Sequence, residues 1–530
     1  MQILIYLLTL VGSGAGFMTQ MLVSGYWTSA FSEDVFYYSV NLATYLLFLG
    51  VGSYLSKKVT QPSLAFLAGI VLVLASLSGT AIPILRFGIK GYGNLIIVPL
   101  ALMALSGLLC GMIIPLALRI ANDEKKVSLG LLFFIDYLAA ILFTLIFTYV
   151  CLVPLGYSKT GLVLGIGSSL VVVMSLLFNR EYQKKLFGLA AISMILPLAA
   201  FYFAQVHIAP RMDRTGVAEL ILNEQSHYQK ILMTEENKVS ENGTPIKERL
   251  LFLDGFIQFS SETEENYHLC IADIPLLAAS VEKIPVKNAL VLGGGDGLAV
   301  RNLLKSQQIE KITLVELDPV MIRLSRENPI LRGYNKDSLS HPKVEVIVAD
   351  AFRWVMEQYR KPRNKYDLIV IDFPWPKNLT LARLFSAEFY RATFQLLSEK
   401  GFVTIQAGPS YLREDPSRTT LSKISASILN TVRSVGLKAF PYVSPEEREA
   451  FVMGTKNSSF DMEKFSQKVS IFGNGVLSVL CRYDSGWQMP EVKINTLNTL
   501  PVSRYMYDWN RANRDRLYFY RGNHLIFLPD

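Results

Sequence analysis

The first part of the chain is dominated by long apolar stretches, and the second part is not. Up to about residue 205, apolar runs alternate with short loops that contain Gly, Pro or charged residues. A helix needs roughly 20 apolar residues to cross the core of a bilayer. The pattern therefore predicts a transmembrane domain of about seven helices over residues 1–205. The expected spans are Ile3–Val23, Phe36–Leu55, Leu64–Leu85, Leu95–Leu118, Leu129–Leu155, Gly161–Phe178 and Leu186–Ala204.

After residue 205 the pattern changes to that of an α/β domain. Short β-branched or aliphatic runs alternate with longer amphipathic stretches, which is typical of a parallel sheet covered by helices. We expect a Rossmann-like nucleoside-binding domain over residues 286–460, a small β-rich part over 206–285 and a C-terminal extension over 461–530. The expected strands are Ala289–Leu292, Ile312–Leu317, Val344–Val348, Tyr366–Ile371 and Gly401–Ile405.

A glycine-rich loop follows the first of these strands. It reads Gly293-Gly294-Gly295-Asp296-Gly297, and a helical pattern begins near Leu298. Glycines let a backbone turn sharply and approach a ligand where a Cβ atom would clash. One such loop is weak evidence for a nucleotide site.

Acidic residues at the ends of later strands strengthen this interpretation. Glu316, Asp350 and Asp372 follow three successive strands, whose carboxyl ends meet at one edge of the sheet. Glu316 lies about 20 residues after the glycine loop and is placed to accept both ribose hydroxyls. Together with Asp296, these acids would repel a pyrophosphate and favour a cationic nucleoside. The pattern therefore favours a domain of the S-adenosylmethionine methyltransferase type.

Composition excludes some classes of function. The net charge is +8, but no basic stripe with interleaved aromatic residues indicates binding to nucleic acid. The four cysteines form no CxxC pair, so we expect neither a metal site nor disulfides.

Several motifs together resemble the spermidine synthase (polyamine aminopropyltransferase) family, specifically its membrane-fused bacterial branch. The resemblance covers most of Gln225–Gly454. It rests on Tyr228-Gln229, Leu253-Asp254-Gly255-Phe256-Ile257-Gln258, Tyr267-His268, the Gly293–Gly297 loop, Val315-Glu316-Leu317-Asp318, Ala349-Asp350-Ala351 and Tyr366–Asp372. It implies that decarboxylated S-adenosylmethionine is the co-substrate, that an amine such as putrescine is the acceptor, and that residues 206–285 form a β-lid.

The resemblance also implies roles for individual residues. Asp372 would be the general base, with Tyr267 as a second catalytic residue. Asp296 would hold the ammonium group of the donor, and its charge would repel the carboxylate of intact S-adenosylmethionine. Residues implied to bind the donor are Gln229, Gly293, Gly295, Asp296, Gly297, Glu316, Asp350 and Ala351, and those implied to bind the amine are His268, Asp296, Asp372 and Trp375.

The sequence departs from the family on the acceptor side. Trp375 stands where the family has a second aspartate after Asp372, and offers only a cation–π face, worth about 0.5–2 kcal/mol. The segment Pro445–Phe451 replaces an aromatic, glycine-containing segment. Within it, Glu446 or Glu447 could restore an acidic anchor, but a solvated loop is the expected alternative.

Localisation follows from the apolar half and from the function that the resemblance implies. We expect a multi-pass protein of the inner cell membrane that contacts the lipid bilayer, with its catalytic domain in the cytoplasm. Loop charges conflict with this orientation, because Lys and Arg gather on the cytoplasmic side and seven full spans would then place the C-terminal domain outside. Either one segment does not cross, or the charge bias misleads.

Two alternative functions stay open at this stage. One is a methyltransferase that uses intact S-adenosylmethionine, against which Asp296 argues. The other is a non-catalytic membrane sensor or transporter that binds a nucleoside or polyamine, for which Trp375 and the apolar setting of Asp136 are the evidence. The sequence also leaves a homo-oligomer, such as a dimer, open.

Overall fold

The computed structural model contains two compact units. One consists mainly of residues 1–218 and the other of Glu219–Leu517. The structure describes residues 2–31, 34–91, 97–122, 128–177, 180–204, 218–239, 245–254, 256–360, 365–409, 419–444, 449–471 and 489–512.

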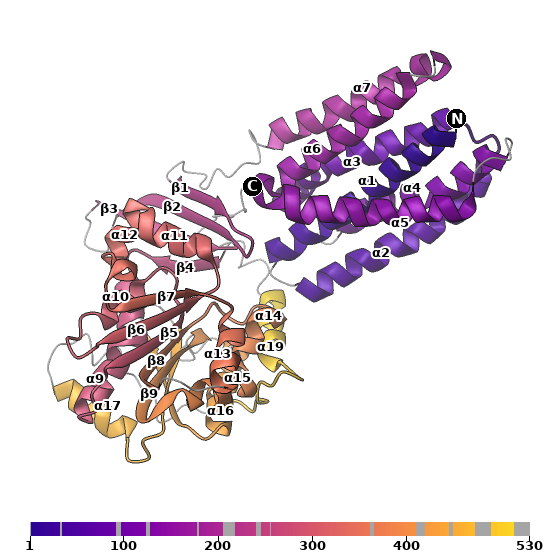
Figure 1. Cartoon of the computed structure of the whole chain (residues 1–530). Helices are drawn as coiled ribbons and strands as arrows, with labels where there is room; N and C mark the ends of the chain where they lie inside the picture. The colour runs from indigo at the N-terminus through magenta and orange to yellow at the C-terminus, as the bar shows by residue number, and fades with distance from the viewer. Residues whose placement is uncertain are drawn as a thin grey trace. The chain divides into compact units, whose positions relative to one another are not determined.

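The first unit is entirely helical in the part that the structure describes (Figure 1). Seven of its helices are long and apolar enough to cross a membrane, as the sequence predicts. A glycine with positive φ, Gly156, kinks the sixth helix near its start. The helices are α1 (Gln2–Phe31), α2 (Asp34–Leu55), α3 (Leu64–Gly91), α4 (Ile97–Asn122), α5 (Leu129–Leu145, followed by a π-helical stretch to Cys151), α6 (Leu152–Leu177) and α7 (Arg180–Phe203).

Helices α2 and α4 pack with their backbones almost in contact. A Cβ atom added to Gly52 would meet the carbonyl oxygen of Leu108, and one added to Gly111 would meet that of Leu49. Small residues that let two helix backbones approach so closely are typical of helix packing inside membranes.

Helix α5 exposes large apolar side chains, including those of Phe134, Tyr137 and Ile141. Asp136 lies in the same helix and is partly buried, with the hydroxyl of Ser13 facing its carboxyl group. An apolar outer surface on a helix of this length suits contact with lipid.

The second unit is built on a seven-stranded sheet with the order β10-β11-β9-β8-β5-β6-β7. The five strands from β9 to β7 are parallel to one another and confirm the expected strands. Strand β11 runs antiparallel to both of its neighbours, β9 and β10, and neither β10 nor β11 was predicted. The strands are β5 (Asn288–Gly293), β6 (Lys311–Glu316), β7 (Val344–Val348), β8 (Tyr366–Asp372), β9 (Leu397–Pro409), β10 (Lys438–Ser444) and β11 (Glu449–Thr455).

Helices cover both faces of this sheet (Figure 1). Leu290 and Leu292 of β5 face one apolar core, and Ala289 and Val291 face the other, because side chains alternate along a strand. The first core is covered by α13 (Ala351–Arg360), α15 (Ala387–Gln395), α16 (Thr419–Ser434) and α19 (Pro501–Ala512), and the second by α9 (Ile274–Val281), α10 (Leu298–Leu303) and α17 (Met462–Ile471).

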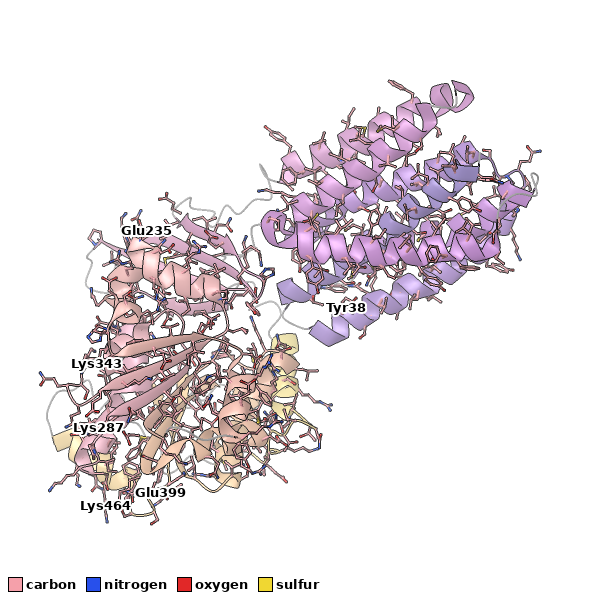
Figure 2. The ribbon with its side chains drawn as sticks, viewed as in Figure 1. Tyr38, Glu235, Lys287, Lys343, Glu399 and Lys464 are labelled. Carbon is pink, nitrogen blue, oxygen red and sulfur yellow. The ribbon has the colours of Figure 1, made fainter. Side chains whose placement is uncertain are left out.

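A four-stranded antiparallel sheet precedes the larger one in sequence. Its apolar face, which includes Ile231 and Leu251, packs against Leu298 and Met321 of neighbouring helices. Glu235 belongs to this sheet and pairs with lysine and arginine side chains (Figure 2). Its elements and the helices beneath it are β1 (Ala218–Gln225), β2 (Lys230–Val239), β3 (Pro245–Leu253), β4 (Phe256–Ser260), α11 (Pro319–Glu327) and α12 (Pro329–Asn335).

The two edges of the large sheet differ in chemistry. At the amino ends of the parallel strands lie Lys287, Lys343 and the exposed Glu399, all labelled in Figure 2. At the carboxyl ends lie the glycine loop and the acids singled out from the sequence. Ligands of open parallel sheets bind outside the carboxyl ends of the strands, so this edge is the candidate site.

Candidate active site at the carboxyl edge of the sheet

The glycine loop between β5 and α10 brings its backbone against two carboxylates. Gly293, Gly294 and Gly297 have φ values of +82°, +67° and +82°, in the left-handed region that favours glycine. A Cβ atom on Gly294 would lie 3.0 Å from Oδ2 of Asp372. A Cβ atom on Gly295 would lie 2.7 Å from Cγ of Glu316. Side chains larger than hydrogen would therefore displace the acids that the loop surrounds.

Asp372 ends β8 and accepts a hydrogen bond from the Tyr267 hydroxyl at 2.6 Å. Burial and the negative charge of Asp296 raise the pKa of Asp372 to about 6. The charge of His268 and the hydrogen bond from Tyr267 oppose this rise in pKa. A carboxylate with such a pKa is ionised at neutral pH and still able to take up a proton, as a general base must be.

Glu316 ends β6 and is buried at the same edge. Its Oε1 accepts from the backbone N–H of Asp318 at 2.9 Å. Burial and the charges of Asp318 and Asp296 raise the pKa of Glu316 to about 7, although backbone hydrogen bonds lower it. Gln229 reaches this place from the small sheet and donates to Oδ2 of Asp318 at 2.9 Å. Asp318 therefore connects Gln229 and Glu316 through hydrogen bonds. The sequence analysis did not recognise this role of Asp318.

Asp296 interacts electrostatically with the carboxyl groups of both Asp372 and Glu316. Its Oδ1 accepts from the backbone N–H of Leu298 at 3.0 Å, so the side chain also supports the start of α10. The structure therefore links three of the four predicted acids into one group, in which Asp296 acts on both Asp372 and Glu316.

Asp350 differs from the other three acids because a cation compensates its charge. Its Oδ2 accepts from the guanidinium of Arg383, and its Oδ1 accepts from the backbone N–H of Arg353 at 2.9 Å. Ala351 is the first residue of α13. Arg383 therefore offsets part of the negative charge that the four predicted acids bring to this edge. Sequence reasoning missed Arg383, because nothing local links it to a residue 33 positions earlier.

His268 is buried and its Nδ1 is held by Glu264. This nitrogen lies 2.6 Å from the Glu264 carbonyl oxygen and 3.1 Å from Oε2. The guanidinium of Arg301 donates to both carboxylate oxygens of Glu264, each at 2.9 Å. Burial lowers the pKa of His268, but the hydrogen bond to Glu264 and the charges of Asp296 and Asp372 outweigh burial and raise it. Glu264 and the acidic group therefore favour the protonated, positively charged form of His268.

Trp375 lies just beyond β8 and its indole N–H points at an acid. Nε1 donates to Oε2 of Glu449, the first residue of β11, at 3.2 Å. The Gln406 amide lies beside it: in the orientation that satisfies both ends, its oxygen accepts from Nε1 at 3.1 Å and its nitrogen donates to the Phe373 carbonyl. Glu446 and Glu447 lie outside the described residues. Glu449, in the same segment, was not proposed from the sequence.

Metal ligands do not gather in the part of the chain that the structure describes, where no three His, Cys, Asp or Glu side chains are placed to hold an ion. Cys110, Cys151 and Cys270 are buried and unbonded there, and Cys481 lies outside it.

Comparison with known proteins shows which family the chain resembles. A model described as the spermine/spermidine synthase domain matches residues 264–443, which contain Tyr267, Asp296, Glu316 and Asp372. A polyamine aminopropyltransferase from Leptospira interrogans is 30% identical, over 96% of this chain and 99% of its own. Polyamine aminopropyltransferase 2 from Aquifex aeolicus is also 30% identical, over 93% of this chain and 96% of its own.

Both alignments cover more than nine-tenths of this chain, so they include the helical unit as well as the α/β unit. Among solved structures, spermidine synthase from Thermotoga maritima matches with a TM-score of 0.38 and 23% identity, over 54% of this chain and 83% of that chain.

Proposed function

Because the chain belongs to the polyamine aminopropyltransferase family, we propose that it moves an aminopropyl group from decarboxylated S-adenosylmethionine to an amine and releases methylthioadenosine. The observation that carries this proposal is the group formed by Asp372, Tyr267, Asp296 and Glu316 at one edge of the sheet. At this edge the carboxylate of Asp372 can accept a proton, and the negative charges of Asp296 and Glu316 suit a cationic donor.

Asp372 is the general base in this proposal. An alkylammonium has a pKa near that of lysine, about 10, and has no lone pair for attack until it loses a proton. Asp372 takes this proton, the amine nitrogen forms a bond to the methylene carbon beside the sulfonium, and the carbon–sulfur bond breaks. The bonding electrons stay on sulfur, so neutral methylthioadenosine leaves. The main contribution of the site is to hold the two reactants close together.

The donor is held by the acids around the glycine loop. The carboxylate of Glu316 has two acceptor oxygens for the ribose hydroxyls. Asp296 binds the terminal ammonium of the aminopropyl group and disfavours intact S-adenosylmethionine, which has a carboxylate at that end. Asp350, with the amide of Ala351, is assigned to adenine, and Gln229 supports the nucleoside through Asp318.

The acceptor amine is assigned to the side of the site formed by Tyr267, His268 and Trp375. Tyr267 holds Asp372 in place by its hydrogen bond. His268, fixed by Glu264, limits the negative charge that Asp372 experiences. The ring of Trp375 offers a face for an ammonium group.

The helical unit is assigned to the inner cell membrane. Seven helices of sufficient length and apolarity support this assignment. The proposal includes a transmembrane domain over residues 1–205, a catalytic domain that faces the cytoplasm, and a lid formed by the four-stranded sheet. The contact of Gln229 with Asp318 supports the lid, since it links that sheet to the carboxyl edge.

One assay tests the proposed reaction. The purified full chain is incubated with decarboxylated or intact S-adenosylmethionine and a panel of amines, and both methylthioadenosine and S-adenosylhomocysteine are measured. We expect methylthioadenosine from the decarboxylated donor in the wild type, and its loss in Asp372→Asn. Formation of S-adenosylhomocysteine would instead identify a methyltransferase, and tight donor binding without either product would identify a binding protein.

A further inference from the structure

We propose that Glu449 binds the ammonium group at the far end of the amine acceptor, and so selects linear amines that carry a positive charge at both ends. This inference rests on the proposed function, because it assigns the near end of the amine to Asp372. It concerns a residue that the sequence analysis did not single out.

The strand register places Glu449 at the same edge of the sheet as Asp372. Ile371, one residue before the end of β8, pairs with Ile405 of β9, so Asp372 lies beside Gln406. Gln406 in turn pairs with Phe451 of β11. Strand β11 is antiparallel to β9, and its first residue, Glu449, therefore lies at the carboxyl edge and not at the opposite end.

The separation suits a short linear amine. Two strand spacings of about 4.8 Å separate β8 from β11, and Glu449 pairs with Pro409, three residues further along β9 than Gln406. The backbones of Asp372 and Glu449 are therefore offset along the strands as well as across them, and lie roughly 14 Å apart. Each carboxylate extends from its backbone toward the ligand, which leaves room for a few methylene groups between two nitrogens. The register also shifts between Glu449 and Phe451. Such irregularities re-aim side chains and are common next to active sites.

Contacts connect Glu449 to the catalytic group. Its carboxylate accepts from Trp375 Nε1 at 3.2 Å, which fixes one oxygen. The ring of Phe451 lies 5.4 Å from that of Tyr267, centroid to centroid, and Tyr267 donates to Asp372. The charges of Asp372, Glu449 and Asp296 all act on the Tyr267 hydroxyl. Glu449 and Asp372 thus both lie within electrostatic reach of one tyrosine hydroxyl.

Charge complementarity identifies the ligand group. A carboxylate that receives an indole N–H keeps further acceptor positions, and a hydrogen bond between ammonium and carboxylate is among the stronger ones in proteins. The adjacent indole ring adds a cation–π face. An amine with a single nitrogen would use Asp372 and leave Glu449 without a ligand.

The substitution Glu449→Gln separates this role from a purely structural one. Glutamine has nearly the same shape, and its amide oxygen can still accept from Trp375 Nε1. The substitution therefore removes the negative charge and keeps the contact. Glu399→Gln is the matched control, because Glu399 lies in β9 near the opposite edge of the same sheet and is exposed (Figure 2).

The test compares putrescine with butylamine, which has the same carbon chain and only one nitrogen. Methylthioadenosine release by the full chain is measured with saturating decarboxylated donor, and butylamine is followed as a substrate or as a competitive inhibitor. In Glu449→Gln we expect the KM for putrescine to rise about 10- to 100-fold, the effect of losing one charge-assisted hydrogen bond. We expect kcat to change far less, and the butylamine constants and the Glu399→Gln control to match the wild type.

Two results would overturn the inference: an unchanged KM for putrescine, or an equal loss for butylamine. The first would leave the proposed function standing if the wild type still releases methylthioadenosine. If the wild type releases none with any amine, the proposed function itself fails. Calorimetric binding of putrescine to both proteins in the presence of methylthioadenosine then still tests Glu449, since equal affinities overturn its role and a loss in Glu449→Gln supports it.

Discussion

The hydroxyl of Tyr267 donates to Oδ1 of Asp372 at 2.6 Å, although the two residues lie 105 positions apart in the chain. A hydrogen bond to a carboxylate favours its ionised form, whereas burial and a neighbouring acid favour the protonated one. Asp372 is subject to all of these effects, because it is buried and the charge of Asp296 acts on it. Tyr267 therefore tunes the proposed base and also positions it.

Replacing Tyr267 with phenylalanine tests this tuning. The pKa of Asp372 is about 6, so activity of the wild type should fall as the pH drops through that value. In Tyr267→Phe we expect this acidic limb to move up by about one pH unit, because the ionised carboxylate loses a donor. We expect kcat at pH 7 to fall about 10-fold, with partial recovery at higher pH. The measurement is kcat against pH with saturating donor.

The control for this experiment is Tyr390→Phe. Tyr390 is also a buried tyrosine, and its hydroxyl has no hydrogen-bond partner among the residues that the structure describes. Its removal should leave the acidic limb in place. If the limb of Tyr267→Phe also stays where it is in the wild type, Tyr267 does not set the protonation of Asp372.

The stability that Asp372 and Glu316 contribute should fall as the pH rises from about 4 to about 7. Asp372 and Glu316 have pKa values raised to about 6 and about 7, so in this range these two carboxyls hold more protons in the folded protein than in the unfolded chain. The stability that these protonated carboxyls provide is lost as each one ionises. Asp372→Asn should therefore stabilise the α/β unit at pH 8, by roughly 2 kcal/mol, and change it little at pH 4.

Tryptophan fluorescence during thermal unfolding can measure this effect, because four of the five tryptophans follow residue 219. The exposed Glu399→Gln serves as the control for loss of a surface charge. A variant that is less stable than the wild type at pH 8 would contradict the prediction. Such a result would mean that the contact with Tyr267 outweighs the cost of burying the charge.

Much of this architecture follows from local sequence. The lengths of the apolar runs identify the seven helices, and the aliphatic runs identify β5 to β9. Glu316 and Asp372 could be assigned to one edge because each ends a strand of a parallel sheet, and such a sheet aligns its carboxyl ends. In these cases a local pattern and a general rule of topology are sufficient.

Other features depend on contacts that local pattern does not encode. The pairing of Arg383 with Asp350 requires a side chain that arrives from a separate turn of chain. Glu449 was not singled out, because the sequence does not show that β11 runs antiparallel beside β9. Strand β10 contains Pro441, which weakens the signal of a strand. Each of these was missed because it is set by tertiary structure.

Asp296→Asn tests the selection of the donor. Asparagine can still accept from the N–H of Leu298, so the start of α10 is preserved while the charge is removed. We expect the affinity for decarboxylated S-adenosylmethionine to fall about 10-fold or more, and that for the intact compound to stay or rise. The acidic limb should also move to lower pH, because the charge of Asp296 raises the pKa of Asp372.

Asp461→Asn is a suitable control, since Asp461 also accepts backbone N–H groups at a helix start but is remote in sequence from the site. Donor affinities are measured by calorimetry with each nucleoside. Equal losses for the two donors in Asp296→Asn would remove the selectivity argument, although Asp296 would still contribute to binding.

Gly295→Ala tests whether the glycine loop and Glu316 act together. The added Cβ atom would lie 2.7 Å from Cγ and 2.9 Å from Oε2 of Glu316, so the carboxylate must move away. Gly295 does not have a positive φ, and alanine there adds no backbone strain. We therefore expect the KM for the donor to rise about 10-fold or more, with a change in stability below about 1 kcal/mol. Gly333→Ala, where a Cβ atom would meet nothing within 4 Å, should leave the KM for the donor unchanged and stabilise α12 by up to about 1 kcal/mol. If Gly295→Ala binds the donor as tightly as the wild type, the ribose does not depend on the position that Glu316 occupies in this structure.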